Sequence, residues 1–503
     1  MNVIDKFLNS YTMYRVILYG LGLISLVALV LSAIGILDFP LLAVATSLAL
    51  VVGVGFIAHT IFAKLFHSAT GAETWLITSL ILFLILKPAQ TKAEYAVLVV
   101  VTVLAMASKY VIAFANRHIF NPVAIALVVL GLLGSGEVYW WVGSKAMLPV
   151  ALLIGLVVLR KTRRFHMLWP FVVVALITHA FMPGVPHDPI AVVRDLIISG
   201  PLVFFATIML TEPATAPPTQ VLRIAYSALV GLLYGWSFHI GPIFSTPEVA
   251  LVTGNIFSYA VSSKRRQRMR LERCTLQAAG VYEFAFTPLD GKLAYKPGQY
   301  LEWTLPHKRH DSRGNRRYFT IASSPTETEI KLAARIDTEH SSTFKKALLD
   351  MKPGDEIWAS QLGGDFRLSR DKGEKLVFIA GGIGITPFRS MVQSIVDQGQ
   401  RRDITLLYTS LAADGFAYWP LFNQAVASGV KPIYVITGPT IPEGWTGKSG
   451  FITSDMIKAE VPDYAHAMFY LSGPNVMVVN YKKVLRSLGV PSRSIKTDYF
   501  PGF

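Results

Sequence analysis

The sequence predicts a polytopic all-α membrane domain of about ten helices, with inverted repeats, fused to a soluble module that joins an antiparallel β-barrel to a doubly wound α/β domain. Three observations support this fold class. The 503 residues exceed what one hydrophobic core accommodates. Runs of Leu, Ile, Val and Ala with few charges continue to about Val261, and ordinary soluble composition follows. Short alternating strands then give way to a glycine loop that opens a helix.

The change in composition sets the expected domain boundaries. We assign residues 1–262 to the membrane domain, 263–274 to a basic linker, 275–370 to the β-barrel and 371–503 to the α/β domain. The net charge is +15, and the densest basic clusters, 160–164 and 264–273, fit cytoplasmic flanks of membrane helices. We therefore expect a multi-pass protein of the plasma (inner) membrane, in contact with lipid, with a cytoplasmic soluble module.

Composition also excludes several classes of protein. No basic patch is interleaved with aromatic residues, so nucleic acid is not an expected partner. The single cysteine, Cys274, excludes a cysteine-ligated iron–sulfur cluster and a disulfide framework within the chain. No metal site is expected, and no removable signal peptide, because the polar N-terminus continues into the first span without a cleavage site.

Ten apolar segments are candidate membrane helices: 16–37, 41–62, 75–86, 93–107, 122–133, 147–159, 168–181, 190–210, 221–236 and 249–261. Several are shorter than the roughly 20 residues that a straight span needs. Short or broken segments at matching places in two halves indicate inverted repeats around a site at mid-membrane. SKYVIAFANRHIFNP (108–122) and SGPLVFFATIMLTEP (199–213) match in this way, since each starts with Ser and ends its apolar body in a Pro break.

The stretch IMLTEPATAPPTQVLR, residues 208–223, ends one of these segments with three prolines. Pro213, Pro217 and Pro218 must break a helix, because proline lacks an N–H and clashes with the preceding turn. Broken backbone at membrane depth is tolerated only where it is buried in protein or lines a cavity. Composition alone leaves two interpretations open, a ligand site or a proline-rich loop outside the membrane.

Three segments, RHIFNPVAIALV, DLIISGPLVFFATIMLTEPATAPPT and TPEVALVTGNIFSYAV, resemble in this order the RnfD/NqrB family of integral-membrane flavoproteins, and the resemblance covers most of the first 262 residues. It implies that Thr219 carries FMN through a phosphoester bond, with Glu212 and Pro213 at the family's Asp-Pro position and Asn121 at the partner break. Glu212 replaces the usual Asp, and an extra proline precedes Thr219. A flavin phosphate needs a hydroxyl on backbone that is held open, and prolines keep a helix from closing over it.

The side of the membrane that Thr219 faces depends on the route of the chain. Ten full crossings from a cytoplasmic N-terminus place Thr219 on the cytoplasmic side, whereas the resemblance implies the outer side. A re-entrant segment around residues 201–210 removes this conflict, and we favour the outer side.

The soluble half begins with strands such as VYEFAFTP and QYLEWTLP, which alternate with a period of two between Pro/Gly turns. A small antiparallel barrel is expected to about Arg367. KLVFIAGGIGITPFRSMVQSIV then indicates an apolar strand, a glycine loop and a helix that open a parallel sheet. Gly381, Gly382 and Gly384 let the backbone approach a ligand, and the helix N-terminus favours a pyrophosphate. A tight turn without a ligand is the alternative.

RRYFTIASSP (316–325), the GGIGITP loop and YLSGPNVM (470–477) resemble in this order the ferredoxin–NADP reductase superfamily, over residues 266–503. The resemblance implies a ferredoxin-reductase-like module that binds FAD and NAD(P)H. It places Arg317 at the FAD pyrophosphate, Phe319 on the isoalloxazine, Thr320 near flavin N5, Gln299 and Tyr300 at the flavin border, and Ser342 or Thr343 at the phosphates. Phe319 and Thr320 are the expected catalytic residues.

The same resemblance places the nicotinamide between two loops. The implied residues are Gly381, Gly382, Gly384, Thr386, Pro387, Gly473 and Pro474. Ser472 stands where many members have Cys, and Phe500 or Phe503 either stacks near the flavin or simply packs. NADH is favoured over NADPH, because LAADGFAY, which follows LLYTS, lacks an Arg for the 2′-phosphate.

Together these features predict a membrane-bound flavoprotein oxidoreductase. Electrons pass from cytosolic NAD(P)H through FAD to FMN on Thr219 and on to a quinone or an extracytoplasmic acceptor, flavin to flavin or through an electron-transfer partner protein. The first alternative is a haem-containing ferric reductase or NADPH-oxidase-like protein, which needs paired histidines. His166 and His179 lie on one candidate helix, and no second helix repeats their spacing. The second alternative is an ion transporter or channel with a regulatory reductase domain.

Overall fold

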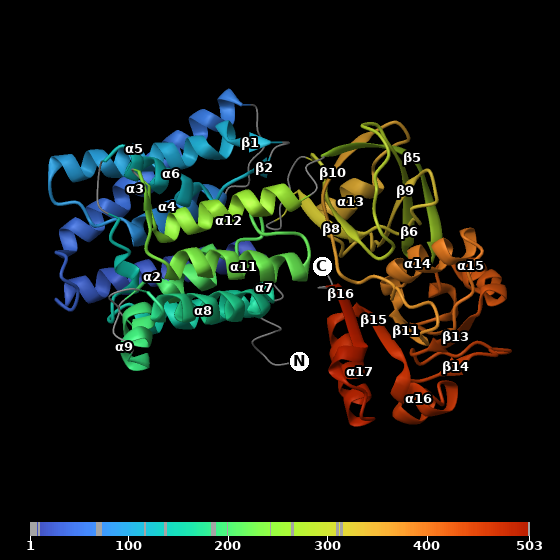
Figure 1. Cartoon of the computed structure of the whole chain (residues 1–503). Helices are drawn as coiled ribbons and strands as arrows, with labels where there is room; N and C mark the ends of the chain where they lie inside the picture. The colour runs from blue at the N-terminus through green and yellow to red at the C-terminus, as the bar shows by residue number, and fades with distance from the viewer. Residues whose placement is uncertain are drawn as a thin grey trace. The chain divides into compact units, whose positions relative to one another are not determined.

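A computed structural model describes residues 8, 11–66, 73–114, 117–134, 138–182, 188–198, 200–241, 243–262, 266–307, 311 and 315–500. Contacts divide the chain into two compact units, residues 2–264 and 265–503 (Figure 1). The first unit is helical apart from two short hairpins, and the second contains two six-stranded sheets.

Each of the ten segments expected to be a span is helical. The helices are α2 (Met13–Ala33), α3 (Leu41–Leu65), α4 (Thr74–Ile85), α5 (Lys92–Val111), α6 (Pro122–Leu132), α7 (Leu148–Thr162), α8 (Phe165–Ala180), α11 (Gln220–Gly235), α12 (Pro247–Val261) and a broken segment of α9 (Pro189–Val193), η2 (Arg194–Ile198), α10 (Leu202–Phe204) and η3 (Phe205–Met209). Among the described residues, α2, α3 and α5 are long and apolar enough to cross a membrane, and the bent pair 190–198 and 202–209 makes a fourth if it forms one span. These lengths do not support the expected ten full spans, because α4, α6, α8 and α11 have only 10–17 residues each.

Polar caps define where several of these helices begin. Thr91 and Glu94 form a capping box at the start of α5. Asn121 caps α6 and Thr246 caps α12, and in both helices proline occupies the first turn, where its missing N–H is tolerated. These breaks between helices therefore carry polar side chains that bind the backbone N–H groups at the helix starts.

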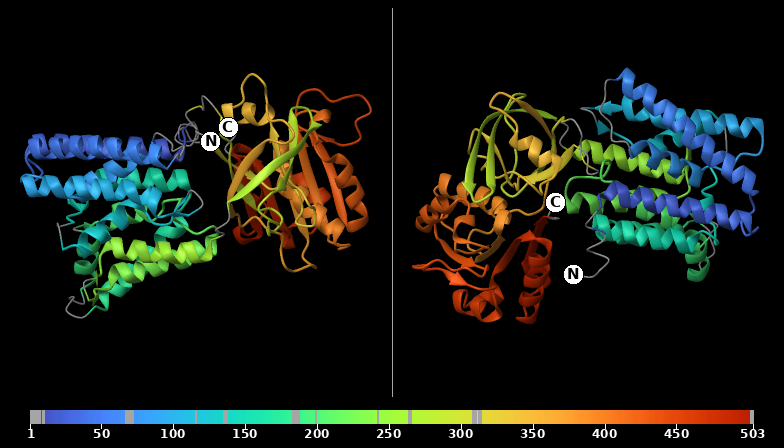
Figure 2. Two further views of the ribbon diagram at one scale, coloured as in Figure 1. Left: turned by 90° about the horizontal axis from the view of Figure 1, so that it is seen from above. Right: turned by 180° about the vertical axis from the view of Figure 1, so that it is seen from behind.

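Helices in the two halves of this unit pack in corresponding pairs. α3 packs on α5 as α8 packs on α11, and α5 packs on α6 as α11 packs on α12. α2 contacts α4 as α7 contacts α10 and η3, while α2 also contacts α7 and α6 contacts α12. Both views of Figure 2 show the longer helices of this unit running roughly parallel to one another. Gly231 lets α11 approach α8, since an added Cβ would lie 2.6 Å from the carbonyl oxygen of Phe171.

The expected match between residues 108–122 and 199–213 does not appear in the local structure. The first segment contains the end of α5, a hairpin of β1 (Ala113–Phe114) with β2 (Arg117–His118) and the cap of α6, whereas the second contains α10 and η3. The first segment reaches polar Arg117 and His118 after a short apolar run, while the second is apolar from Pro201 to Leu210 except for Thr207. The packing pairs instead relate α4 to α10 and η3.

An antiparallel barrel opens the second unit. Its strands are β5 (Gln267–Ala278), β6 (Val281–Pro288), β7 (Tyr300–Thr304), β8 (Arg316–Thr320), β9 (Ile330–Arg335) and β10 (Glu356–Gly363), in the order β8-β7-β10-β5-β6-β9. A bridge between Ile321 and Leu332 joins the two ends of this order. Helix α13 (Thr343–Leu349) packs Phe344 and Leu348 into the barrel core.

The segment expected as a basic linker, 263–274, is mostly a barrel strand. β5 begins at Gln267 and buries Met269 and Leu271 between exposed Arg268 and Arg270. Buried and exposed residues alternate here, as expected for a strand with one buried face. The many charged residues made this alternation hard to recognise in the sequence.

A parallel sheet completes the unit, with the order β14 (Lys448–Ser449), β13 (Val430–Ile436), β12 (Ile404–Ser410), β11 (Leu376–Gly381), β15 (Met468–Pro474) and β16 (Ile495–Phe500). Helices α14 (Thr386–Asp397) and α15 (Trp419–Gln424) pack on one face, and α16 (Ser454–Glu460) and α17 (Asn475–Ser487) on the other. The expected doubly wound domain is therefore confirmed. The strand order reverses between β11 and β15, and ligands of such sheets bind at the carboxyl ends beside this point.

Candidate active site

Two glycine loops meet at the carboxyl ends of β11 and β15. A Cβ added to Gly384 would lie 2.3 Å from the carbonyl oxygen of Ser472 and 2.6 Å from Cα of Gly473. Gly473 has a φ of 154°, and a Cβ there would lie 3.2 Å from Cα of Gly381. Side chains at Gly384 and Gly473 would push the loops apart. The structure thus brings the two sequence-predicted nicotinamide loops into contact.

The loop after β11 leads directly into α14. Gly382 has a φ of 51°, which favours glycine, and Oγ1 of Thr386 donates to the Ile383 carbonyl oxygen at 3.2 Å. Pro387 lies in the first turn of α14, and Pro474 is the N-cap of α17. The N-terminus of α14 therefore lies beside both loops, a position that attracts a pyrophosphate.

Ser472 and the C-terminal aromatic residues border the same loops. The Ser472 side chain is buried, and its Oγ has no hydrogen-bond partner in the part of the chain that the structure describes. A buried hydroxyl in this state leaves a donor and acceptor for a ligand. Phe500 ends β16 with its backbone paired to Pro474, but its side chain and the whole of Phe503 lie outside the described residues.

Strands β7 and β8 bring the expected flavin residues together. Their register pairs Tyr300 with Thr320, and the Gln299 carbonyl oxygen accepts the N–H of the residue after Thr320 at 2.9 Å. Thr320 is buried, whereas Phe319 is half-buried with its ring centroid 5.9 Å from that of Phe344 in α13. A flavin at this strand end would therefore meet both aromatic and hydroxyl groups.

Arg317 and the start of α13 converge on a carboxylate. Nη2 of Arg317 donates to Oδ1 of Asp311 at 3.4 Å, and the Thr343 N–H donates to Oδ2 at 3.2 Å. Ser342 is the N-cap of α13, and its Oγ accepts the Lys345 N–H at 3.4 Å. The donors that the resemblance assigned to the FAD pyrophosphate thus already bind an anionic group. Their chemistry fits phosphate oxygens.

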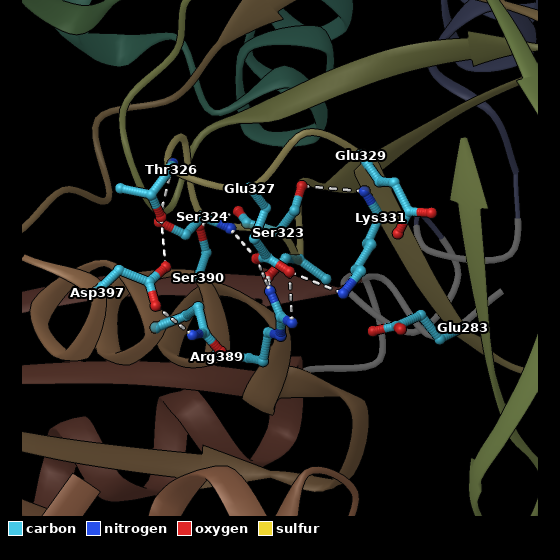
Figure 3. A network of polar contacts seen from close by, with 12 residues as sticks. Glu283, Ser323, Ser324, Thr326, Glu327, Glu329, Lys331, Arg389, Ser390 and Asp397 are labelled. Atoms are coloured by element: carbon cyan, nitrogen blue, oxygen red, sulfur yellow. Dashed lines mark hydrogen bonds and ion pairs between the residues drawn. The ribbon is translucent and has the colours of Figure 1, made fainter. Parts of the chain in front are cut away.

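A polar network joins the barrel to α14 (Figure 3). Arg389 pairs with Glu327 through both terminal nitrogens, and Nη1 also donates to the Ala322 carbonyl oxygen at 3.1 Å. Lys331 Nζ lies 2.7 Å from Oε1 of Glu327. Burial alone would raise the pKa of Glu327, but the adjacent Arg389 and Lys331 hold the pKa below its ordinary value. Sequence reasoning missed this pair, because Glu327 and Arg389 are 62 residues apart.

A polar cluster connects the breaks of the membrane half. Asn121 Nδ2 donates to Oε2 of Glu212 at 2.8 Å, and the Asn121 N–H donates to Oδ1 of Asn255 at 2.8 Å. Thr215 Oγ1 donates to Glu212 at 3.3 Å, and Asn255 Nδ2 donates to the Tyr226 hydroxyl at 3.3 Å. The structure thus joins the two predicted breaks. Asn255 was missed, although a lone amide within apolar α12 is itself a signal of function.

The second break, which runs from Pro213, holds Thr219 at the start of α11. Thr219 is half-buried and is the N-cap residue, yet its side chain makes no capping hydrogen bond. Arg223, one turn into the helix, donates from Nε to the Pro217 carbonyl oxygen at 2.9 Å and from Nη2 to that of Pro218 at 3.1 Å. The hydroxyl therefore lies at a helix N-terminus, which favours a phosphate group.

Comparison with known proteins locates the enzyme module. Residues 378–483 match the model of the oxidoreductase NAD-binding domain. The flavohemoprotein of Halalkalibacterium halodurans is 23% identical over 245 residues, which cover 46% of this chain and 58% of that protein. The flavohemoprotein of Pseudomonas putida is 26% identical over 241 residues, which cover 46% of this chain and 59% of that protein. The FAD/NAD-binding domain of a nitric oxide dioxygenase from Vibrio cholerae is 20% identical, with a TM-score of 0.41, and covers 46% of this chain and 98% of that domain.

The family model and the two flavohemoproteins decide the class of the C-terminal half. It is an NAD(P)H-dependent flavin oxidoreductase module. The expected NAD-binding domain is thereby confirmed, and the similarity to flavohemoproteins supports FAD and NAD(P)H as the bound groups. The chain spans less than three fifths of the length of these curated relatives.

Proposed function

We propose that the chain is a membrane-bound oxidoreductase that passes electrons from NAD(P)H through FAD to an FMN bound covalently at Thr219, and on to a quinone or an extracytoplasmic acceptor. FAD accepts a hydride and releases electrons singly, which couples a two-electron donor to one-electron carriers. The single cysteine leaves no ligand set for an iron–sulfur cluster within the chain. Electrons therefore pass from flavin to flavin or through a partner protein.

Residues of the soluble module bind and orient the two redox groups. Arg317 and the start of α13 would hold the FAD pyrophosphate, and Thr320 would donate a hydrogen bond to the bound flavin. The loops around Gly384 and Gly473 enclose the nicotinamide. NADH is the favoured coenzyme, because the segment after β12 presents Leu411 to solvent, 61% exposed, and no cation for a 2′-phosphate between residues 411 and 418.

The main observation that supports electron transfer to a membrane flavin is that the Thr219 hydroxyl makes no capping hydrogen bond. Prolines keep the backbone before α11 out of a helix, and Arg223 holds two of their carbonyl groups. The hydroxyl makes no capping bond, so forming a phosphoester there would not remove a helix cap. The phosphate would gain the favourable field of the α11 N-terminus.

The packing pairs of the membrane half support an inverted repeat and supply an internal comparison. In these pairs α5 corresponds to α11, so Thr91 corresponds to Thr219. The Thr91 hydroxyl accepts the Glu94 N–H at 3.3 Å within a closed capping box. At the equivalent position after Thr219 the chain has Leu222, which forms no such box. This difference supports our proposal of a flavin at the second break and not at the first.

The test is flavin fluorescence of the full-length protein in a denaturing gel. Thr219→Val should abolish the fluorescent band, because it removes the oxygen that forms the ester and little else. Thr91→Val is the matched control and should leave the band at wild-type intensity. A band that persists in Thr219→Val would show that the flavin is attached elsewhere, and its absence from wild-type protein would refute covalent attachment.

A haem-containing reductase is the second candidate, and the similarity to flavohemoproteins favours it. Histidine side chains described in the membrane half are dispersed. His59 in α3 lies 2.9 Å, through Nδ1, from the Tyr110 hydroxyl, and His166 and His179 lie at opposite ends of α8. A visible spectrum of purified protein separates the candidates. A Soret band would show that haem is bound, and electrons would then pass through haem and not through a membrane flavin.

A further inference from the structure

The network between the barrel and α14 connects strand β8, where the flavin is expected, to the helix that starts at the nicotinamide loop. β8 ends at Thr320, and residues 321–327, which we name the β8 turn, follow it directly. α14 starts at the nicotinamide loop. Arg389 binds Glu327 and the Ala322 carbonyl oxygen. Ser390 Oγ donates to the Ser323 carbonyl oxygen at 2.5 Å, and Thr326 Oγ1 donates to Oδ2 of Asp397 at 2.5 Å. Figure 3 labels Arg389, Glu327, Ser390, Ser323, Thr326 and Asp397.

The barrel side of this network is braced independently. The Ser324 N–H donates to Oε2 of Glu327 at 2.6 Å, and Lys331 Nζ donates to Oε1 at 2.7 Å. The Tyr295 hydroxyl donates to the Ser323 carbonyl oxygen at 3.0 Å. These bonds within the barrel fix the conformation of the β8 turn, against which α14 packs.

A second tie restrains the guanidinium of Arg389. Tyr418, which precedes α15, donates from its hydroxyl to Oε2 of Glu283 in β6 at 2.8 Å. The Arg389 guanidinium lies 5.6 Å from the centre of the Tyr418 ring. Tyr418 thus joins the α/β domain to the barrel beside the Arg389 guanidinium.

Burying this ion pair is unfavourable, so a contribution to stability alone does not account for it. The side chains of Arg389 and Glu327 are 7% and 18% exposed, and Nε of Arg389 is buried without a partner among the described residues. Apolar replacements of buried ion pairs are often neutral or stabilising, and an unsatisfied buried donor is unfavourable. A fork of two parallel bonds does, however, specify distance and angle.

We propose that Arg389 and Glu327 are positioning residues that set the separation between strand β8 and the nicotinamide loops for hydride transfer. They act through the β8 turn and the first turn of α14 and not on the reacting atoms. The proposal rests on hydride transfer from NAD(P)H to FAD in this module. The reacting atoms must approach to about 3–3.5 Å, and a displacement of about 1 Å lowers rates about 10²-fold.

Stopped-flow reduction of the full-length protein by NADH tests the proposal. The first phase of flavin bleaching, per bound FAD, gives a limiting rate and a Kd for NADH. Arg389→Lys keeps the charge but loses the fork, and Glu327→Gln keeps the shape but loses the charge. Each should lower the limiting rate about 10- to 100-fold with the Kd and FAD content unchanged.

The matched control is Glu329→Gln, which breaks the ion pair of Glu329 with Arg273 within the barrel. It should bleach at the wild-type rate. Wild-type limiting rates in Arg389→Lys and Glu327→Gln would overturn the proposal, as would an equal loss in Glu329→Gln. Failure of wild-type protein to bleach with either NADH or NADPH would instead refute hydride transfer itself.

Discussion

Replacing Gly384 with Ala perturbs the contact between the two nicotinamide loops most directly. The new Cβ would lie 2.3 Å from the Ser472 carbonyl oxygen and 2.5 Å from its carbonyl carbon, both backbone atoms. Ordinary contact starts at 3.4 Å, so the loops must separate by about 1.1 Å. Overpacking of this kind costs about 1–3 kcal/mol, and a shift of about 1 Å lowers the rate of an aligned transfer about 10²-fold.

The assay is stopped-flow bleaching of the flavin by NADH, together with the Tm of the full-length protein. Gly384→Ala should bleach about 100-fold more slowly than wild type while it retains FAD. Gly373→Ala is the control, because its Cβ would lie 3.5 Å from Oδ1 of Asp371, an ordinary contact. A wild-type bleaching rate in Gly384→Ala would refute the argument that contact between the loops places the nicotinamide.

Three further predictions concern single charged residues. Arg317→Lys should weaken FAD binding about tenfold or more, since a lost charged hydrogen bond costs about 1.5–3 kcal/mol. Equilibrium dialysis of released flavin measures this affinity. An unchanged affinity for FAD would show that Arg317 does not bind FAD. Arg223→Gln should lower gel flavin fluorescence per protein several-fold, because the two proline carbonyl groups lose their donor; an undiminished band would contradict this role. The depressed pKa of Glu327 means that its ionised form stabilises the fold above the ordinary value of 4.5 and that this stability is lost as pH falls through the lower folded value. The Tm difference between wild type and Glu327→Gln should therefore narrow below pH 4.5, and a difference that stays constant with pH would exclude Glu327 as its source.

Local chemistry explains which features could be predicted from the sequence. Gly382 and Gly473 stand where the backbone adopts φ values that favour glycine, so their motifs carried structural information before any fold was known. The break before Thr219 followed from proline geometry alone. The barrel start was misplaced, because Arg268 and Arg270 resembled part of a charged linker until Met269 and Leu271 were seen to be buried beside them.

Long-range pairing explains what the sequence could not predict. Arg389 and Glu327 become partners only when the α/β domain packs against the barrel, and neither residue type identifies the other in advance. The repeat of the membrane half was aligned on shared Ser and Pro residues, whereas its packing relates α4 to α10 and η3. Helix contacts, and not terminal residues, define that correspondence.

Electron transfer between the two flavins is the central claim, and an anaerobic reaction of full-length protein with NADH measures it most directly. Flavin absorbance is followed in wild type and in Thr219→Val, both with FAD bound. Wild type should bleach in two phases, a fast one for FAD and a slower one for the flavin on Thr219, and Thr219→Val should show the fast phase alone. Identical traces from the two proteins would contradict a path through Thr219.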